Sequence, residues 1–441
     1  MTSSLLRSTA VGALGGLLFG FDTVVIAGTT AQLRQIFHLN SQGLGLTVSI
    51  ALWGTVAGCI LAGPLGQRIG GRNALRLMAL LYIVSALGCA FAWNWPSLMV
   101  FRFIGGLGIG GSSVLGPVYI AELAPAEWRG RLVSTFQANV VLGILFAYIS
   151  NWWIARLGLG AAEWRWELGI AFVPALLFFV LLYTIPHSSR FLVGRGSTDD
   201  ALAVLRRMGT ENPQTELEVI RASLHHESAQ RSAPLFRRSL RLPIFLAITI
   251  GLFNQLSGIN AILYYANDIF AAAGLSRLST FSQSIFIGIA NLVGTAAGVL
   301  LIDKIGRKTL LLLGAAATFF CLITTAVLFQ RGTHVGLVVW LLVVFIGFFA
   351  MSQGAVIWVY ISEVFPTLVR SKGQSLGASS HWIMDAIVAS LFPLAVERFS
   401  RSAPFFFFAA MTALQFFVVL FVYPETKGAT LEQLQARLEN R

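Results

Sequence analysis

A run of polar side chains interrupts an otherwise apolar stretch, FLAITIGLFNQLSGINAILYYANDIF, at residues 245–270. Asn254 and Gln255 stand in tandem there, followed by Asn260 and Tyr264, and we expect Gly258 to loosen the helix between them. Positions 260 and 264 share one face of a helix, and the tandem amides are close enough to border the same cavity. Carboxamides offer donors and acceptors together, which suits a ligand rich in hydroxyl groups. Interhelical packing is the alternative, but it seldom needs two adjacent amides and a third five residues later.

Four more residues in apolar runs could line such a cavity. Gln137 and Asn291 are isolated amides, each as consistent with helix packing as with ligand binding. Trp358 and Trp382 would ordinarily be interfacial or core residues, but an aromatic face also suits the apolar face of a sugar ring. We expect all four to be candidates for the same cavity.

Asp22 poses a different question, because it lies within GLLFGFDTVVIAG at residues 16–28. A charge near the bilayer centre costs roughly 2.5–3.5 kcal/mol on insertion scales, so we interpret Asp22 as a candidate functional residue. Arg102 is the basic residue that we place within a helix of the same half. Burial favours the neutral acid and Arg102 favours the carboxylate, so a cycle that alternates their pairing would alternate proton affinity. A permanent salt bridge between two helices is the alternative.

The elements that must position these residues are membrane-spanning helices. The chain has 441 residues, 56% hydrophobic and 11% charged, with a mean hydropathy of +0.75. A spanning helix needs about 20 largely apolar residues, and about twelve such runs recur. The sequence therefore predicts an all-α polytopic membrane protein. The expected spans are 9–33, 44–66, 74–93, 97–121, 132–155, 168–186, 242–272, 280–302, 308–329, 335–360, 374–396 and 403–423.

The net charge of +12 reflects topology, because its basic residues gather in alternate loops. By the positive-inside rule we expect these loops, and both termini, to be cytoplasmic. This explains the positive charge without a nucleic-acid-binding surface. The loops expected inside carry Arg68, Arg72, Arg76, Arg129, Arg131, Lys304, Arg307, Lys308, Arg370 and Lys372. Those expected outside carry Arg34, Arg156, Arg165, Arg277, Arg331, Arg398 and Arg401.

Several other patterns are set aside. The three cysteines are dispersed in apolar runs, which argues against a disulfide framework. The G-x-G-x-x-G match at Gly106, Gly108 and Gly111 lies inside an apolar run, where glycines let helices approach closely. The run after Arg7 lacks a convincing cleavage region, so we interpret it as the first helix. No nucleophile–base pair or metal-ligand spacing is present, so we expect neither an enzyme nor a cofactor.

The polar segment 187–241 separates six expected spans from six, and we interpret it as a cytoplasmic linker with short helices. The flanking halves, 1–186 and 242–441, repeat one another. YIAELAPAEWR from Tyr119 matches YISEVFPTLVR from Tyr360, and GPLGQRIGGRNAL from Gly63 echoes GVLLIDKIGRKTL from Gly298. Repeated halves with a site near the membrane midplane are typical of secondary transporters.

At this point the motifs resemble a known family. FNQLSGINAILYYA closely resembles the QQ-x-x-G-I-N-x-x-x-Y-Y signature of the sugar porter family in the major facilitator superfamily. FRFIGGLGIG, YIAELAPAEWRG, DKIGRK and PETKG also match, so that the resemblance runs from Gly15 to Gly428. The family includes bacterial xylose– and glucose–proton symporters and the facilitative glucose transporters of animals. Its fold is two six-helix pseudo-repeat bundles.

The resemblance implies roles for particular positions. Sugar would be bound by Gln137, Asn254, Gln255, Asn260, Tyr264, Asn291 and Trp358, to which the aromatic argument adds Trp382. Sugar–proton symporters carry Asp at the position of Asp22, whereas facilitative transporters carry Asn. A cytoplasmic ion-pair clasp holding the outward-facing state would comprise Glu122, Arg129, Asp303, Arg307, Glu363 and Arg370.

Five positions depart from the family pattern. Asn254 replaces the usual Gln, while His381 and Asp385 stand beside Trp382 at positions that are commonly amides. Gln67 replaces the aspartate of the first D-R-x-G-R motif, whose spacing Gly71 disturbs. His187 replaces the glutamate of PESPRWL, so we expect a weaker clasp in the N-terminal half.

The expected function is a proton-coupled symporter that imports a monosaccharide, a hexose or a pentose, by alternating access. The nearest alternatives are an inositol or polyol symporter and a facilitative uniporter. A non-transporting sugar sensor belongs to another class, but sensors of this fold tend to carry long cytoplasmic tails, and only a short tail follows the last expected span. We expect a multi-pass protein of the cytoplasmic membrane that acts as a monomer.

Overall fold

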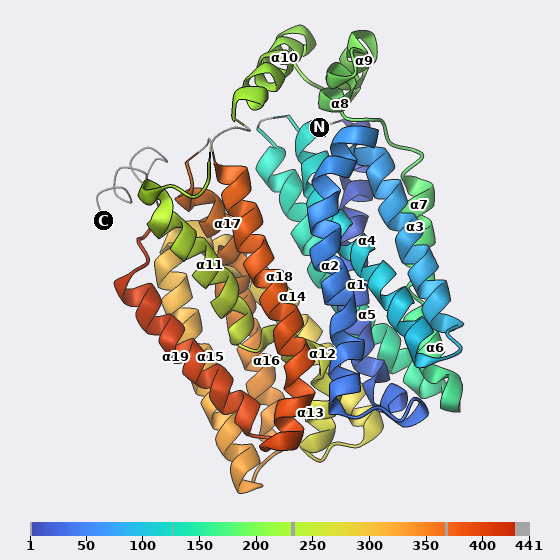
Figure 1. Ribbon diagram of the computed structural model, residues 1–441, viewed down its shortest axis with the longest axis vertical. Coiled ribbons are helices and arrows are strands. Elements are labelled where there is room, and N and C mark those ends of the chain that lie inside the picture. Colours follow the sequence, from blue (N-terminus) through green and yellow to red (C-terminus); the bar gives the residue numbers. More distant parts are fainter. Residues whose placement is uncertain (1, 126, 231–233, 367–368, 428–441) are drawn as a thin grey trace. The chain divides into compact units, whose positions relative to one another are not determined.

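The computed structural model describes residues 2–125, 127–230, 234–366 and 369–427, and within these ranges it contains helices and no strand (Figure 1). The helices of the N-terminal half and linker are α1 (Ser3–Ile36), α2 (Ser41–Ile69), α3 (Gly71–Ala90), α4 (Trp95–Leu123), α5 (Arg129–Leu157), η1 (Gly160–Ala162), α6 (Glu163–Gly169), α7 (Phe172–Leu181), α8 (Ser189–Gly194), α9 (Thr198–Met208) and α10 (Pro213–Gln230). Those that follow are η2 (Arg238–Leu240), α11 (Arg241–Leu256), α12 (Ile259–Tyr264), α13 (Ala266–Ala272), α14 (Arg277–Ile305), α15 (Arg307–Arg331), α16 (Leu337–Phe349), η3 (Ala350–Gly354), α17 (Ala355–Val364), α18 (Arg370–Arg398) and α19 (Ala403–Phe421).

Twelve helical segments of the described chain are long and apolar enough to cross a membrane, which confirms the expected number. Nine of them are single helices, and three contain a break. The broken spans are Gly160–Leu181, Arg241–Tyr264 and Leu337–Val364. The break in Arg241–Tyr264 falls among the polar residues that opened the sequence analysis.

Glycine ends α2 and α14 in the same way. Gly70 separates α2 from α3 with φ 84°, and Gly306 separates α14 from α15 with φ 101°. A positive φ is costly for residues with a Cβ, so both reversals require glycine. Aligning the halves on these two glycines places Gly71 opposite Arg307 and Gln67 opposite Asp303.

Contacts divide the chain into two compact units. The first unit comprises Met1–Ile26, Ile50–Ser150 and Gly158–Ser232; the second comprises Ala27–Ser49, Asn151–Leu157 and Ala233–Arg441. The bounds of these units differ from the predicted bundles 1–186 and 242–441, joined by 187–241, and the division into those bundles stays a prediction.

In the first unit, glycines of α4 lie directly against neighbouring helices. A Cβ on Gly106 would meet the Ala51 carbonyl of α2, and one on Gly111 would meet the Met78 side chain of α3. The G-x-G-x-x-G match therefore serves close helix packing, as the sequence predicted. The residues between the halves form α8, α9 and α10, which share a small core (Figure 1). That core contains Ala201, Leu205, Leu217 and Ile220.

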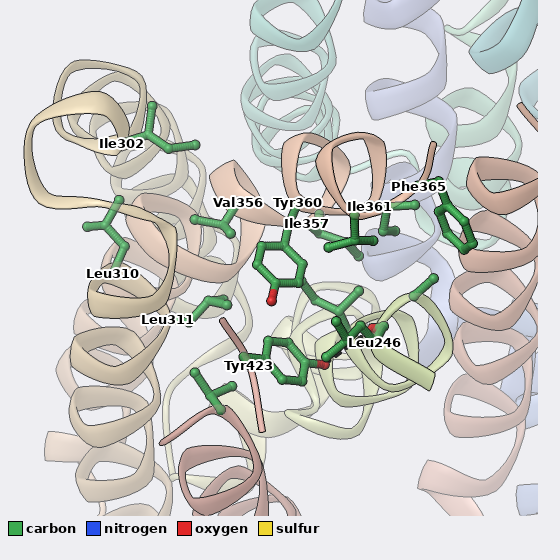
Figure 2. Close-up of a cluster of buried hydrophobic side chains, with 14 of the residues drawn as sticks. Leu246, Ile302, Leu310, Leu311, Val356, Ile357, Tyr360, Ile361, Phe365 and Tyr423 are labelled. Atoms are coloured by element: carbon green, nitrogen blue, oxygen red, sulfur yellow. Dashed lines mark hydrogen bonds between the residues drawn. The ribbon is translucent and has the colours of Figure 1, made fainter. Parts of the chain in front are cut away.

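The second unit has a core between α11, α15, α17 and α19. Figure 2 shows Leu246, Leu311 and Ile357 there, around the stacked rings of Tyr360 and Tyr423. Burying such side chains supplies the packing that holds the spans in register. The same unit includes the end of α1 and the start of α2. Asn267 Nδ2 donates to the Ala27 carbonyl at 3.1 Å, and Ser390 Oγ donates to Ser49 Oγ at 2.7 Å.

Candidate functional site

The candidate site in the second unit begins at an interruption of a membrane helix. α11 ends at Leu256, and Gly258 has φ 83° before α12 starts at Ile259. A Cβ on Gly258 would collide with the Phe408 ring of α19, so the position excludes larger residues on two grounds. The sequence predicted that Gly258 loosens this helix, and the structure confirms it. Interrupted helices expose backbone and redirect side chains where transporters bind their ligands.

The tandem amides just before the break reach α18. Gln255 is 1% exposed, and its Nε2 donates to His381 Nε2 at 3.0 Å. The same Nε2 lies 3.4 Å from Asn254 Oδ1, so the two amides contact each other as well. Gln255 Oε1 is buried and has no hydrogen-bond partner among the described residues. Since the amide nitrogen only donates, the facing nitrogen of His381 accepts and the ring is neutral.

The residues just after the break reach the same helix one turn further on. Asn260 Nδ2 donates to Asp385 Oδ2 at 2.8 Å, and Tyr264 Oη donates to the same oxygen at 2.9 Å. Asn260 and Tyr264 therefore share a face, as their spacing predicted. His381 and Asp385 are four residues apart on α18, so one helix face collects the amides from both sides of the break.

Aromatic rings surround His381. Its ring centroid is 5.2 Å from that of Trp358 on α17 and 5.0 Å from that of Trp382 beside it on α18. Trp382 is 6% exposed, whereas Trp358 is 38% exposed and so keeps a face available. Five of the predicted sugar ligands, together with both tryptophans, thus belong to elements of one unit. The five are Asn254, Gln255, Asn260, Tyr264 and Asn291.

Two predicted ligands stand apart from the α18 cluster. Asn291 is half-buried on α14, and among the described residues it is not hydrogen-bonded to the other amides. Gln137 is exposed on α5 and belongs to the first unit. Their part in binding the same ligand stays a prediction.

The predicted proton pair lies within the first unit. Asp22 on α1 is 8% exposed and Arg102 on α4 is 3% exposed. Arg102 Nη1 is 3.9 Å from Asp22 Oδ2, at the outer limit of an ion pair. That oxygen and Arg102 Nε are both buried without a hydrogen-bond partner among the described residues. A long, incompletely satisfied pair between buried charges can change its pairing at lower cost than a close bidentate one.

Three of the predicted clasp residues meet in the second unit. Arg307 donates through Nη1 to Asp303 Oδ1 and through Nη2 to Glu363 Oε1, both at 2.9 Å. Glu425 caps the start of α15, because its carboxylate accepts from the backbone N–H groups of Arg307 at 2.9 Å and Lys308 at 3.0 Å. A carboxylate at a helix N-terminus also meets the positive end of the helix dipole.

The corresponding place in the first unit lacks these charges. Gly71 and Gln67 occupy the positions that match Arg307 and Asp303, and His187 takes the place of Glu425 after the matching proline. Arg72 Nη2 donates to His187 Nε2 at 2.7 Å. Burial, and then the charges of Arg72 and Arg76, lower the pKa of His187 to about 4. The ring is therefore neutral at pH 7 and offers no negative charge.

The other clasp candidates have separate positions. Glu122 is half-buried near the end of α4, and Arg129 is exposed at the start of α5. Arg370 begins α18, where its Nε lies 3.4 Å from the Phe365 carbonyl. The structure thus brings together Asp303, Arg307 and Glu363, while the clasp role of all six residues stays a prediction.

Some residues of these clusters were absent from the expected site. His381 and Asp385 were noted only as departures, although a carboxyl group in an apolar span is itself a signal. Glu425 could have been found by extending the internal repeat, since Tyr119 Oη donates to the Pro186 carbonyl and Tyr360 Oη donates to the Pro424 carbonyl.

Gln353 was also missed. It is 1% exposed in the π-helical turn η3, and neither polar atom of its side chain has a partner among the described residues. Single π-helical turns occur frequently at functional sites, and they have no clear sequence signature.

Comparison with known proteins identifies the family to which this chain belongs. The family model described as "Sugar (and other) transporter" matches residues 8–438. The chain belongs to the sugar transporter family. It is 36% identical to the arabinose-proton symporter of Bacillus subtilis (strain 168), over 98% of this chain and 94% of that one. It is 34% identical to the D-xylose-proton symporter of Escherichia coli (strain K12), over 99% and 96% of the two chains.

Solved structures agree with this assignment. The inward-open xylose transporter of E. coli superposes with a TM-score of 0.88 at 32% identity, covering 98% of this chain and 99% of that one. A proton:xylose symporter of the major facilitator superfamily bound to 6-bromo-6-deoxy-D-glucose gives 0.80, also at 32% identity, covering 99% of each chain. The fold is the major facilitator fold, and the sugar transporter is a multi-pass membrane protein rather than an enzyme.

Proposed function

We propose that this sugar transporter is a proton-coupled symporter that imports a monosaccharide across the cytoplasmic membrane by alternating access. The observation that carries the proposal is the broken span of the second unit, in which Gln255 and Asn260 converge on one face of α18. An amide-rich surface suits a neutral ligand with many hydroxyl groups. The arabinose and xylose symporters among its relatives support a pentose or hexose.

Sugar binding would use amides for the hydroxyl groups and tryptophans for the apolar ring face. Gln255 Oε1 is an acceptor without a donor, so a sugar hydroxyl can satisfy it. The exposed face of Trp358 can cover C–H groups of the ring. The proposed ligands are Gln137, Asn254, Gln255, Asn260, Tyr264, Asn291, Trp358 and Trp382.

Proton coupling would involve Asp22 and Arg102. When the pair is close, Arg102 favours the carboxylate; when it separates, burial favours the acid, so a change in their pairing loads or releases a proton. Each proton carried inward gains about 2.3 kcal/mol per 100 mV of membrane potential. That free energy corresponds to about fifty-fold accumulation of the sugar.

The cycle also needs groups that hold its states. We propose that two six-helix bundles, 1–186 and 242–441, rock about the linker 187–241. The clasp on the cytoplasmic side would comprise Glu122, Arg129, Asp303, Arg307, Glu363 and Arg370. Both termini would be cytoplasmic, from the placement of Arg and Lys, and one chain in the lipid bilayer would suffice for transport.

An uptake assay tests the proposal. Transport-deficient bacterial cells expressing the protein are given labelled D-xylose, L-arabinose, D-glucose or myo-inositol, with and without a protonophore. We expect one or more monosaccharides to accumulate above equilibrium, and the protonophore to reduce uptake to equilibration. Equilibration unaffected by the protonophore would indicate a uniporter, and preferential uptake of inositol a polyol carrier. Binding without any uptake would indicate a sensor and contradict the proposal.

A further inference from the structure

Asp385 carries a carboxyl group that the proposed mechanism does not use. It lies on α18, in a candidate span, and is 0% exposed. Its Oδ2 accepts both hydrogen bonds, from Asn260 and from Tyr264, while Oδ1 is buried without a partner among the described residues. A carboxylate in this place has two neutral donors, which is poor compensation for a full buried charge.

Among the described residues, no positive charge contacts this carboxyl group. α18 packs against α11, α12, α17 and α19, and it is hydrogen-bonded to Tyr265 and to Ser49 of α2. The charged and tyrosine side chains of these elements are Arg241 at the first residue of α11, Tyr264 on α12, Tyr265 between α12 and α13, Tyr360 and Glu363 near the end of α17, and Arg68 in the last turn of α2, whereas α19 has none. Tyr360 donates to the Pro424 carbonyl and Glu363 accepts from Arg307. Of these groups, Tyr264 is the one bonded to Asp385.

The helix that carries Asp385 supplies no counter-charge either. Its basic residues, Arg370, Lys372 and Arg398, occupy the first and last turns of α18. His381 lies one turn before Asp385, but its ring accepts from Gln255 and is therefore neutral. The charge state of Asp385 must be set by the proton itself and by whatever enters the site.

The two donors on Asp385 are also two of the proposed sugar ligands. A hydrogen bond to an ionised acceptor is roughly twice as strong as one between neutral groups. An ionised Asp385 therefore holds Asn260 Nδ2 and Tyr264 Oη firmly, in competition with a sugar hydroxyl. Once Asp385 is protonated, the two bonds weaken, and both donors become available to the ligand.

We infer that Asp385 is a proton site inside the sugar site, at which the ionised carboxylate withholds Asn260 and Tyr264 from the sugar and the protonated acid releases them. The step forms one O–H bond, with the proton taken from solution, and no covalent bond breaks. By linkage, if the sugar binds the protonated protein more tightly, the protein must take up a proton when the sugar binds.

This inference rests on the proposed function and adds to it. The Asp22–Arg102 pair belongs to the first unit and would respond to conformation there. Asp385, in the second unit, would make sugar affinity itself depend on the proton. Proton uptake that accompanies equilibrium sugar binding to the purified protein should therefore persist in the Asp22→Asn variant, even where net transport is lost, because that substitution leaves Asn260, Tyr264 and Asp385 in place.

Calorimetry on the purified full-length protein tests this directly. D-xylose and L-arabinose are titrated into the protein from pH 5 to 9, in pairs of buffers that differ in ionisation enthalpy, so that heat reports protons taken up. For the wild type, the Kd should rise about tenfold per pH unit above the midpoint, with uptake approaching one proton per sugar. Asp385→Asn should bind at all these pH values with the low-pH affinity and take up no proton.

Two further variants separate titration from a structural role. Asp385→Glu should keep the pH dependence, since it keeps the carboxyl group. Tyr264→Phe removes one donor to the carboxylate, which disfavours the ionised form, so the midpoint of its pH profile should move upward. Glu397→Gln makes the same charge change at an exposed position of α18 and should match the wild type. Each variant is first checked for a monodisperse elution profile.

The outcomes distinguish this inference from the proposed function. If the wild type binds sugar with no proton uptake and a flat pH profile, Asp385 is not a coupled proton site. Equal pH profiles for the wild type and Asp385→Asn would overturn the inference in the same way, while the symporter proposal stands. If no sugar of the panel binds at any pH, the proposed function fails and this inference falls with it.

Discussion

At the scale of single residues, the sugar-site proposal depends on where each buried polar atom finds its partner. Gln255 and Asn260 both bond to α18, yet Gln255 Oε1 and Asp385 Oδ1 are left without donors among the described residues. Buried acceptors without donors carry a desolvation penalty, which a ligand with hydroxyl groups can relieve.

Truncating these amides should remove sugar binding. We expect Gln255→Ala or Asn260→Ala to abolish saturable binding of D-xylose or L-arabinose while the protein still folds and inserts. Each substitution removes hydrogen bonds of about 0.5–1.5 kcal/mol net, and more where a partner is stranded. Calorimetry on purified protein measures the effect.

The matched control for this pair is Gln415→Ala. It removes a buried amide of the same unit, on α19, outside the proposed set of ligands, and should keep wild-type affinity. Wild-type affinity in the Gln255 and Asn260 variants would show that both residues serve helix packing and do not bind the sugar.

Asp22 should be required for coupling rather than for binding. We expect Asp22→Asn to abolish uphill accumulation and sugar-induced alkalinisation, because the neutral amide cannot carry the proton that Arg102 and burial exchange. Sugar binding and counterflow exchange should survive. Energised vesicles and counterflow assays measure these properties, with Asp200→Asn on the exposed surface of α9 as the control. Accumulation that persists in Asp22→Asn but is lost in Asp385→Asn would transfer the coupling role to the second unit.

At the scale of elements, the N-termini of α3 and α15 are capped differently although their sequences are similar. Glu425 caps α15 through two backbone N–H groups, whereas α3 begins after Gly70 with no side-chain cap. His187 occupies the position that corresponds to Glu425, and its ring accepts a hydrogen bond from Arg72 instead of capping α3. The N-terminal half thus has a neutral ring that accepts from Arg72 where the C-terminal half has a carboxylate cap, which agrees with the expectation of a weaker clasp there.

His187 should make stability depend on pH. The pKa of His187 is lowered to about 4 in the folded protein, while an unfolded histidine titrates near about 6.5. Between these values the unfolded chain binds the extra proton. The contribution of His187 to stability is therefore complete above about 6.5 and is lost as the pH falls toward 4.

Thermal unfolding in detergent measures this contribution. The unfolding temperature should fall on acidification, and His187→Gln should fall less. His334→Asn, at an exposed loop position with φ 51° that asparagine tolerates, should behave as the wild type. His187→Glu should raise the unfolding temperature at pH 7 by pairing with Arg72. Identical acid sensitivity of the wild type and His187→Gln would contradict this account.

At the scale of the whole molecule, the distribution of charge predicts the orientation of the chain in the membrane. Four loops rich in Arg and Lys alternate with loops that hold few, and the linker helices α8–α10 carry several more. The inner leaflet and the membrane potential retain such loops in the cytoplasm. The linker and both ends of the chain should therefore be inaccessible from outside.

Cysteine labelling tests this topology. In a background without Cys59, Cys89 and Cys321, Glu211→Cys in the turn between α9 and α10 should be labelled by an impermeant maleimide only after permeabilisation. Thr333→Cys, exposed between α15 and α16, should be labelled in intact cells. The reverse pattern would invert the proposed orientation.

The sequence by itself determined the class of this protein and much of its candidate site. Hydropathy is a local property, so the twelve spans could be counted from composition, and their number is confirmed. Helical spacing placed Asn260 and Tyr264 on one face, and the missing Cβ predicted the break at Gly258. These inferences needed no information from distant parts of the chain.

The tertiary structure alone decided which distant groups meet. The bond between Asn260 and Asp385 joins residues 125 positions apart, and it could not be predicted because spacing along a helix says nothing about contacts between helices. The register of the two repeats was similarly ambiguous at Gly70 and Gly71 until the positive φ at Gly70 fixed it. Asp385 became more than a departure from a pattern once both of its donors proved to be proposed sugar ligands. Whether a buried carboxyl group lacks a counter-charge depends on every helix packed around it, and packing in three dimensions determines that.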